Sequence, residues 1–223
     1  MLINEVTQRK DIPLQYMYKC VFIMGSPASG KSTFAEKRIL PPEFRIEDLD
    51  NVMNWLKFKE YNKSNTSTAW NKMQQRRRYW TDEGLPIASV TTGKDINRTI
   101  EDANRFKQAG YDVFGLYVFT ELQTAINRAL EREKHAEKKR DQRKTDPEYI
   151  EYVWGILANT RNQLSSEFKG SFSGFTMALN TDWIDPFNRI NDIAVRDLNK
   201  FINKPLTNPI GLEKLRGQEA FGK

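Results

Sequence analysis

The sequence contains one cysteine and one histidine among its 223 residues, and it has no long apolar run. A single cysteine excludes an internal disulfide framework, and one cysteine with one histidine argues against a zinc site. The absence of about 18 consecutive apolar residues excludes a predicted membrane span. The N-terminal stretch MLINEVTQRKDIPLQ carries charges where a signal peptide needs apolar residues, so we expect a cytoplasmic location.

The composition is that of a globular protein, with 39% hydrophobic and 29% charged residues. The length predicts a single domain over residues 1–223, which is large enough to bury a sizeable core. Lysine and arginine number 35 against 29 aspartate and glutamate residues, so the formal charge is 35 − 29 = +6. This excess is compatible with an anionic partner, such as a nucleotide or a nucleic acid.

Short apolar runs alternate along the chain with segments of helical composition. The run YKCVFIM (Tyr18 to Met24) predicts a strand that is buried on both faces, as in a parallel sheet. Such alternation predicts an α/β fold in which helices cover both faces of a parallel sheet of about five strands. The other predicted strands are 44–50, 86–90, 111–119 and 175–179, and the predicted helices are 32–38, 51–83 with a loop at 62–68, 95–109, 122–143, 147–168 and 192–202.

The first strand runs directly into GSPASGKS, which matches the phosphate-loop pattern G-x-x-x-x-G-K-[ST]. Small residues allow successive backbone N–H groups to surround a phosphate, and the following helix presents its positive end. Lys31 can bridge the β- and γ-phosphates of a nucleotide, and the Ser32 hydroxyl can coordinate Mg²⁺. The predicted nucleotide-binding segment is Gly25, Ser26, Pro27, Ala28, Ser29, Gly30, Lys31, Ser32 and Thr33. A phosphate loop alone does not distinguish a kinase from a hydrolase or a switch.

Two aspartates lie at the carboxyl end of the second predicted strand, at the edge of the sheet that faces a ligand. Phosphoryl transfer to a hydroxyl needs a carboxylate that orients the acceptor and takes its proton. Asp50 is the first candidate for this role, and Asp48 could assist it or contact Mg²⁺. The alternative is that Glu47, Asp48 and Asp50 only cap the next helix.

Residues 128–144 carry eight lysine or arginine side chains and four acidic ones. Small kinases use mobile cations that close over the transferred phosphate and exclude water, so residues 128–146 are a candidate helical lid. Arg140 and Arg143 are the candidates for closing over the transition state, and Arg128 and Arg132 are candidates for binding the nucleotide. A solvated helix with i,i+4 ion pairs is the alternative.

A second basic cluster, RRRYW at residues 76–80, combines charge with aromatic rings. This combination suits contacts with phosphates and stacking on unpaired bases, so Arg76 and Arg77 are candidate substrate contacts. Such clusters are also common on ordinary surfaces, and helical spacing would distribute the three arginines around the axis.

Together these motifs resemble phage-encoded P-loop kinases related to the zeta toxins and the polynucleotide kinases. The similar stretches are MGSPASGKSTFA (24–35), LD (49–50), GLPIASVTTGKD (84–95), AGYDVFGLYVFTELQTAINRALERE (109–133) and KPLTNPIG (204–211). The resemblance implies a P-loop NTPase three-layer sandwich with a helical lid, and it implies ATP and Mg²⁺ as cofactors. Thr91, Thr92 and Gly93 resemble the family's D-x-T-G-[RK] turn beside the acceptor site, but Val90 stands where that family has an acidic residue.

The resemblance implies transfer of phosphate from ATP to a hydroxyl group, with host cytoplasm as the location if the protein is phage-encoded. Relatives act on 5′-hydroxyl ends of polynucleotides, on nucleotide-sugars, and on 5-hydroxymethyluracil in DNA. The positive charge and the cluster at 76–80 favour DNA as the substrate. The alternatives are a small-molecule kinase like the zeta toxins and a nucleotide-hydrolysing switch that acts on a protein partner. No obligate protein partner or membrane partner is expected, and the tail at 204–223 carries no readable signal.

Overall fold

The computed structural model describes residues 12–35, 40–58, 62–134, 145–180 and 188–221. Five strands form one parallel sheet in the order β2-β3-β1-β4-β5. This arrangement confirms the predicted α/β fold with a five-stranded parallel sheet. The strands are β1 (Lys19–Met24), β2 (Arg45–Glu47), β3 (Ile87–Val90), β4 (Asp112–Phe119) and β5 (Phe175–Leu179).

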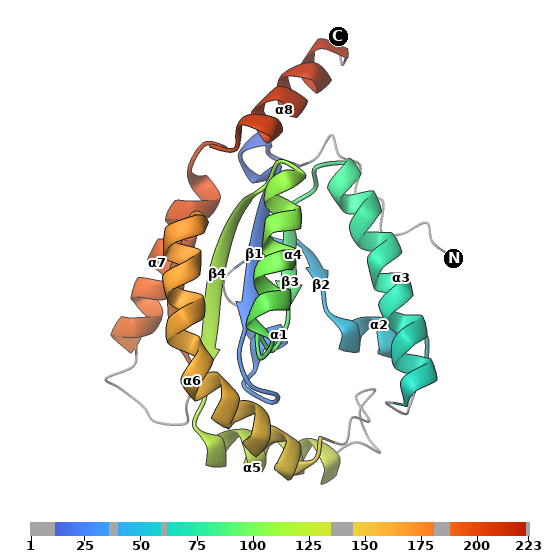
Figure 1. Ribbon diagram of the computed structural model, residues 1–223, viewed down its shortest axis with the longest axis vertical. Helices are drawn as coiled ribbons and strands as arrows, with labels where there is room; N and C mark the ends of the chain where they lie inside the picture. The colour runs from blue at the N-terminus through green and yellow to red at the C-terminus, as the bar shows by residue number, and fades with distance from the viewer. Residues whose placement is uncertain (1–11, 36–39, 59–61, 135–144, 181–187, 222–223) are drawn as a thin grey trace.

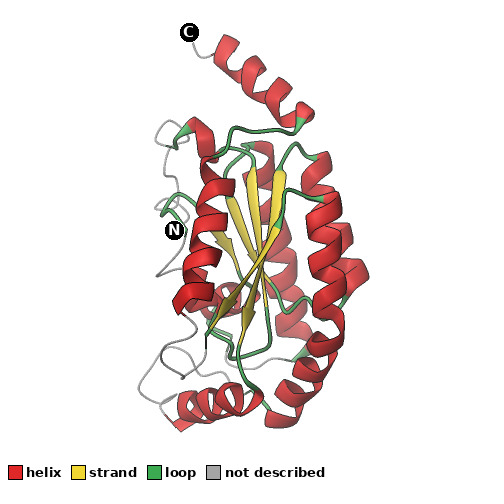
Figure 2. Cartoon of the chain, turned by 90° about the vertical axis from the view of Figure 1, so that its left-hand side faces the viewer, coloured by secondary structure: helices red, strands yellow, loops and turns green. Residues whose placement is uncertain are grey.

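Helices lie on both faces of this sheet (Figure 2). They are α1 (Lys31–Phe34), α2 (Leu49–Trp55), α3 (Lys63–Asp82), α4 (Ile96–Gln108), α5 (Leu122–Lys134), α6 (Pro147–Ser171), α7 (Asn188–Asn203) and α8 (Pro209–Phe221), with a short 3₁₀ helix at Leu14–Tyr16. No helix in these described segments is both long and apolar enough to cross a membrane.

The central strand β1 supplies side chains to two separate cores because successive residues of a strand point to opposite faces. Cys20, Phe22 and Met24 pack with α4 and α6. Val21 and Ile23 pack with α7 on the other face. All six residues of β1 are buried, which explains why Cys20 to Met24 appear in the sequence as an uninterrupted apolar run.

The carboxyl ends of the strands meet at one edge of the sheet, where α1, α2 and α5 also lie (Figure 1). In Figure 1 this edge is at the bottom, and α8 extends from the opposite end of the molecule. In open parallel sheets, ligands bind at the carboxyl edge. The fold therefore places the phosphate-loop sequence where a ligand is expected.

The predicted loop at 62–68 is wrong, because α3 begins at Lys63. The Asn62 side chain accepts a hydrogen bond from the Asn65 N–H at 2.9 Å and caps the helix. The hydroxyl of Thr66 donates to the Asn62 carbonyl at 2.8 Å, within the first turn. These polar residues therefore satisfy the start of a helix rather than forming a loop.

The C-terminal tail contains a helix that the sequence did not indicate. Thr207 and Asn208 donate backbone hydrogen bonds to the Asp112 carboxylate at 2.9 and 3.0 Å. The same carboxylate pairs with the fully buried Lys19 at 2.9 Å, and burial lowers the pKa of that lysine although Asp112 opposes the shift. This network fixes the beginning of α8 to the amino-terminal end of β4.

Candidate active site

The phosphate loop joins β1 to α1 through backbone conformations that require glycine. Gly30 has φ +84°, and a Cβ atom there would lie 2.1 Å from the side-chain nitrogen of Asn180. Gly25 has φ +148°, and a Cβ atom there would lie 2.4 Å from the Val118 carbonyl oxygen. Both conformations are ones that L side chains rarely adopt. The loop is therefore closely fitted between α1 and the ends of β4 and β5.

Lys31 lies across this loop. Its ammonium group donates hydrogen bonds to the carbonyl oxygens of Gly25 at 2.9 Å and Ser26 at 2.7 Å. The side-chain oxygens of Ser26 and Ser29 are buried, and neither has a hydrogen-bond partner in the described part of the chain. A buried hydroxyl without a hydrogen-bond partner costs free energy, so binding of a ligand that provides the partner would be favourable. The loop thus presents one cation and two buried hydroxyls, which fits a phosphate.

Ser32 and Asp48 make a close polar contact at the site. The Ser32 hydroxyl donates to a carboxylate oxygen of Asp48 at 2.5 Å. Asp48 is buried and caps α2, since its other oxygen accepts the Asp50 N–H at 2.9 Å. A hydroxyl beside a carboxylate fits Mg²⁺, which is usually bound by one or two carboxylates together with waters and nucleotide phosphates. Among the described residues, no group of three or more His, Cys, Asp and Glu side chains could hold a metal ion alone.

Asp50 lies in the first turn of α2 and is half-buried. The cap at Asp48 brings both aspartates to the carboxyl edge of β2, close to the start of α1. The capping role raised as an alternative in the sequence therefore applies to Asp48, and it coexists with the contact to Ser32.

The turn after β3 lies directly against the phosphate loop. The Gly25 N–H donates to the Thr92 carbonyl at 3.3 Å, and the Thr91 N–H donates to the Ile23 carbonyl at 3.0 Å. A Cβ atom on Gly93 would touch the Met24 side chain at 3.2 Å. The structure thus brings the three residues proposed for the acceptor side next to the nucleotide segment.

Sequence reasoning missed a layer of residues behind the loop. The Asn180 side chain donates to the Ser29 carbonyl at 2.7 Å, and the Thr120 hydroxyl donates to the same carbonyl at 3.2 Å. Arg128, from α5, donates to the Asn180 carbonyl at 3.0 Å. These contacts join residues up to 151 positions apart, so no local pattern could have revealed them.

Of the four predicted lid arginines, the structure places two. Arg128 lies beside the phosphate loop through Asn180, and Arg132 follows one turn later on α5. Arg140 and Arg143 lie outside the described residues, as does most of the predicted lid. The described part of α5 ends at Lys134, so the predicted helix to residue 143 is confirmed only to that point.

Arg77 is held in a buried ion-pair network, which does not support the predicted contact with a substrate. Its guanidinium donates to both oxygens of Glu47 at 2.6 and 2.7 Å and lies 3.3 Å from Asp102. Ser89 also donates to Glu47, at 2.9 Å. Burial alone would lower the pKa of Arg77, but the hydrogen bonds and charge of Glu47, with Asp102, raise it above its ordinary value. The contacts assign Arg77 to fastening α3 and α4 to the sheet.

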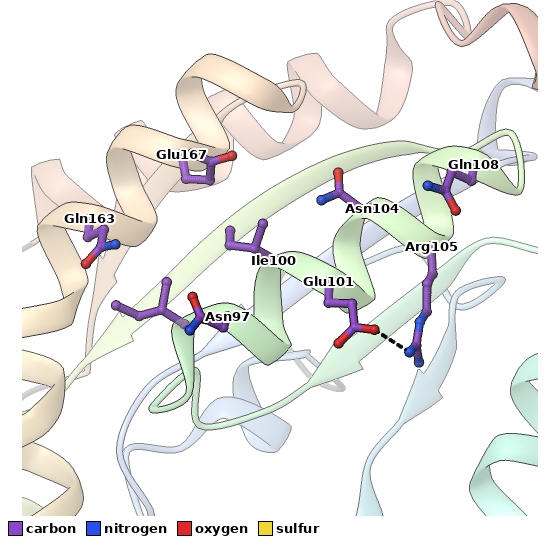
Figure 3. Close-up of a pocket in the computed structure, with 9 residues that line it drawn as sticks. Asn97, Ile100, Glu101, Asn104, Arg105, Gln108, Gln163 and Glu167 are labelled. Carbon is purple, nitrogen blue, oxygen red and sulfur yellow. Dashed lines mark hydrogen bonds and ion pairs between the residues drawn. The ribbon is translucent and has the colours of Figure 1, made fainter.

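A surface hollow of about 590 Å³ lies between α4 and α6 (Figure 3). Ile100 and Asn104 of α4 and Gln163 and Glu167 of α6 line it, and the Glu101–Arg105 ion pair lies at its side. All of its lining residues come from these two helices. It therefore belongs to a different part of the molecule from the phosphate loop.

Comparisons with known proteins show similarity in fold but not in sequence. No protein-family model and no curated protein matches the chain. A structure from the PezAT chromosomal toxin–antitoxin system of Streptococcus pneumoniae is similar with a TM-score of 0.56 and 11% identity, over 90% of this chain and 93% of that one. A chain from the Pnkp1/Rnl/Hen1 RNA repair complex is similar with a TM-score of 0.55 and 11% identity, over 96% and 87%.

A protein from Chloroflexus aurantiacus that is provisionally called a kinase is also similar, with a TM-score of 0.58, 12% identity, and coverage of 83% of this chain and 98% of that one. At these identities the likeness establishes the fold. It agrees with the three-layer P-loop architecture expected from the sequence.

Proposed function

We propose that this protein is a kinase that transfers the γ-phosphoryl group of ATP to a hydroxyl group on DNA. The observation that carries the kinase proposal is the contact between Ser32 and Asp48 beneath a phosphate loop. A hydroxyl and a carboxylate at this position are the protein ligands that Mg²⁺ needs in phosphoryl transfer. The fold likeness to a toxin–antitoxin chain and an RNA repair chain supports the same architecture.

The residues of the site divide the reaction between them. The backbone and hydroxyls of the loop would bind the β-phosphate, and Lys31 would exchange its two loop carbonyls for oxygens of the β- and γ-phosphates. Ser32 and Asp48 would hold Mg²⁺, which when bound neutralises charge on those phosphates. Asp50 would orient the acceptor hydroxyl and take its proton. The acceptor oxygen then bonds to the γ-phosphorus, the bond to the bridging oxygen breaks, and ADP leaves.

The proposal for the acceptor starts from the distribution of basic side chains. The chain has a formal charge of +6, and residues 63–78 contain five basic and no acidic side chains; one of the five, Arg77, is paired with Glu47 inside the protein. A surface of that kind favours a polyanion over a neutral small molecule. The acceptor hydroxyl would belong to 5-hydroxymethyluracil or to a 5′-hydroxyl end.

The test is transfer of label from γ-labelled ATP to DNA with and without 5-hydroxymethyluracil, and to oligonucleotides with free 5′-hydroxyl ends. We expect Asp50→Asn to abolish transfer and leave ATP affinity nearly unchanged, because Asp50 serves the acceptor. Asp48→Asn should lower transfer and also weaken Mg²⁺-dependent ATP binding. Asp192→Asn, at an exposed position on α7, is the matched control.

Three results separate the alternatives. Label that appears only as free phosphate with every acceptor contradicts a kinase and favours a hydrolysing switch. Label on nucleosides or nucleotide-sugars but not on DNA contradicts the polynucleotide acceptor. A mass gain of about 80 daltons on one nucleoside, the mass of a single phosphoryl group, identifies the nucleoside that carries the acceptor hydroxyl.

A further inference from the structure

Trp55, the last residue of α2, has 48% of its surface exposed. Two cations of α3 lie over its ring: the Lys72 ammonium is 6.0 Å and the Arg76 guanidinium 5.9 Å from the ring centre. Arg76 also lies 5.1 Å from the ring centre of Trp80, which is 7% exposed. The contact with Trp80 is part of the packing, but the outer part of the Trp55 ring faces solvent.

A second exposed ring continues this arrangement along α3. Tyr79 has 54% of its surface exposed. Residues 72, 76 and 79 follow i,i+4 and i,i+3 spacing, so they lie on one side of the helix. Lysine, arginine and tyrosine thus form a row beside Trp55. We call Trp55, Lys72, Arg76 and Tyr79 the α2–α3 platform.

The part of α3 that precedes Tyr79 carries charge of one sign, and the acidic residues Asp82 and Glu83 follow only after that ring. From Lys63 to Arg78 the sequence contains five basic side chains and no acidic one. The start of α6 differs, because one cation, the Lys94 ammonium, lies 5.0 and 5.8 Å from the ring centres of Tyr149 and Tyr152, and Glu148 and Glu151 adjoin these rings in the chain. Two cations over a ring suit a polyanion better than one cation flanked by carboxylates.

We infer that the α2–α3 platform binds single-stranded nucleic acid, with Trp55 stacking on an unpaired base and Lys72 and Arg76 contacting the backbone. Proteins that hold single strands combine a cationic surface with aromatic rings in this way. Stacking needs unpaired bases, so a continuous duplex is a poorer ligand. The inference deepens the proposed function and depends on it for one point only, that the bound strand is the acceptor.

The platform is close enough to the candidate site to hold its acceptor. Asp48 caps the beginning of α2 and Trp55 ends it, seven residues later. Seven residues of helix span about 10 Å, which equals about three nucleotides of a stacked strand. We therefore expect the platform to increase the binding affinity of acceptors of three or more nucleotides and to leave the affinity of single nucleosides unchanged.

The experiment measures binding of 12-nucleotide dT and U strands, labelled at the 3′ end, by fluorescence anisotropy without ATP. Trp55→Ala should weaken binding roughly 5- to 150-fold, the loss expected for one stacked base. Trp55→Leu, which keeps apolar packing but has no ring, should weaken binding to a similar extent. Trp55→Phe should retain most of the affinity. Tyr152→Ala, which removes a more exposed ring on α6, is the control.

Salt dependence tests the cations separately. Lys72→Ala should reduce the slope of log affinity against log salt by about 0.7, as one released counterion predicts for a single strand. Lys169→Ala, at an exposed lysine of α6, is the matched control and should leave the slope unchanged. The strand type that binds more tightly identifies DNA or RNA as the ligand.

Three results would overturn the platform: no strand binding at 50 mM salt, equal losses for Trp55→Ala and Tyr152→Ala, or unchanged binding by Trp55→Leu. The proposed kinase activity fails independently. Strand binding that depends on Trp55 without phosphoryl transfer to any acceptor would contradict the kinase and leave the platform. Transfer to nucleosides without strand binding would contradict the platform and leave the kinase.

Discussion

Replacing Arg77 with alanine separates a structural role from a substrate contact. Glu47, its main partner, has a side chain that is 1% exposed, and Arg77 itself is 11% exposed. Removing one partner of a buried ion pair leaves an uncompensated charge and costs about 3–5 kcal/mol of unfolding free energy. For a protein of this length, that loss lowers the melting temperature by roughly 6–20 °C.

The assay is chemical denaturation followed by circular dichroism, with ATP and acceptor kinetics measured on the same preparations. Arg78→Ala is the matched control, because Arg78 is an exposed neighbour on the same helix and its loss should stay within about 0.5 kcal/mol. The double variant Arg77→Met with Glu47→Gln should recover part of the lost stability, since no unpaired charge remains buried.

The opposite pattern would refute this reasoning. If Arg77→Ala lowered the free energy of unfolding by under 1 kcal/mol and raised KM for the acceptor several-fold, Arg77 would be a substrate contact and not a residue that stabilises the fold. A loss of stability equal to that of Arg78→Ala would likewise show that the ion pair between Arg77 and Glu47 does not stabilise the fold.

Three further outcomes follow from particular contacts. Gly30→Ala should abolish binding of a fluorescent ATP analogue, because its Cβ would collide with Asn180; Gly155→Ala, with no atom within 4 Å of the new Cβ, should leave that binding unchanged. Asn208→Ala should remove the hydrogen bonds to the Lys107 and Tyr111 carbonyls and speed hydrogen exchange selectively in α8, so uniform exchange changes would contradict local anchoring. Burial raises the pKa of Tyr117 to about 12. The neutral phenol therefore contributes fully to the free energy of unfolding below about pH 10, and about 2–3 kcal/mol of that free energy is lost as the pH rises towards 12. Tyr117→Phe should flatten that part of the stability profile, and an unchanged alkaline slope would show that other groups cause it.

The parts of the fold that the sequence predicted are those governed by local burial. β4 is buried along nearly its whole length, so Val113 to Phe119 form a run without charged side chains, and the strand begins one position after the predicted strand and ends with it. The phosphate loop was equally readable, because Gly25 and Gly30 are required by backbone geometry at fixed spacing. Local patterns predict such features because their causes are local.

The features that were missed depend on contacts between distant residues. α8 is fixed by Asp112, which lies 95 positions before Thr207. Asn180 reaches the phosphate loop across 151 positions. The start of α3 is a different case, since the Asn62 cap is local, but asparagine, serine and threonine favour caps and loops alike. Composition therefore could not decide between them.

The three consecutive arginines of α3 show why total charge is a weak guide to partners. Adjacent helical positions are about 100° apart, so the three side chains cannot share one environment. Arg76 lies over Trp55, Arg77 is paired with Glu47 inside the protein, and Arg78 faces solvent. Arg77 is thus neutralised within the fold, as Lys19 is by Asp112, and neither can attract a polyanion. The case for a nucleic acid consequently rests on which cations surround exposed rings, and at the α2–α3 platform those cations are Lys72 and Arg76.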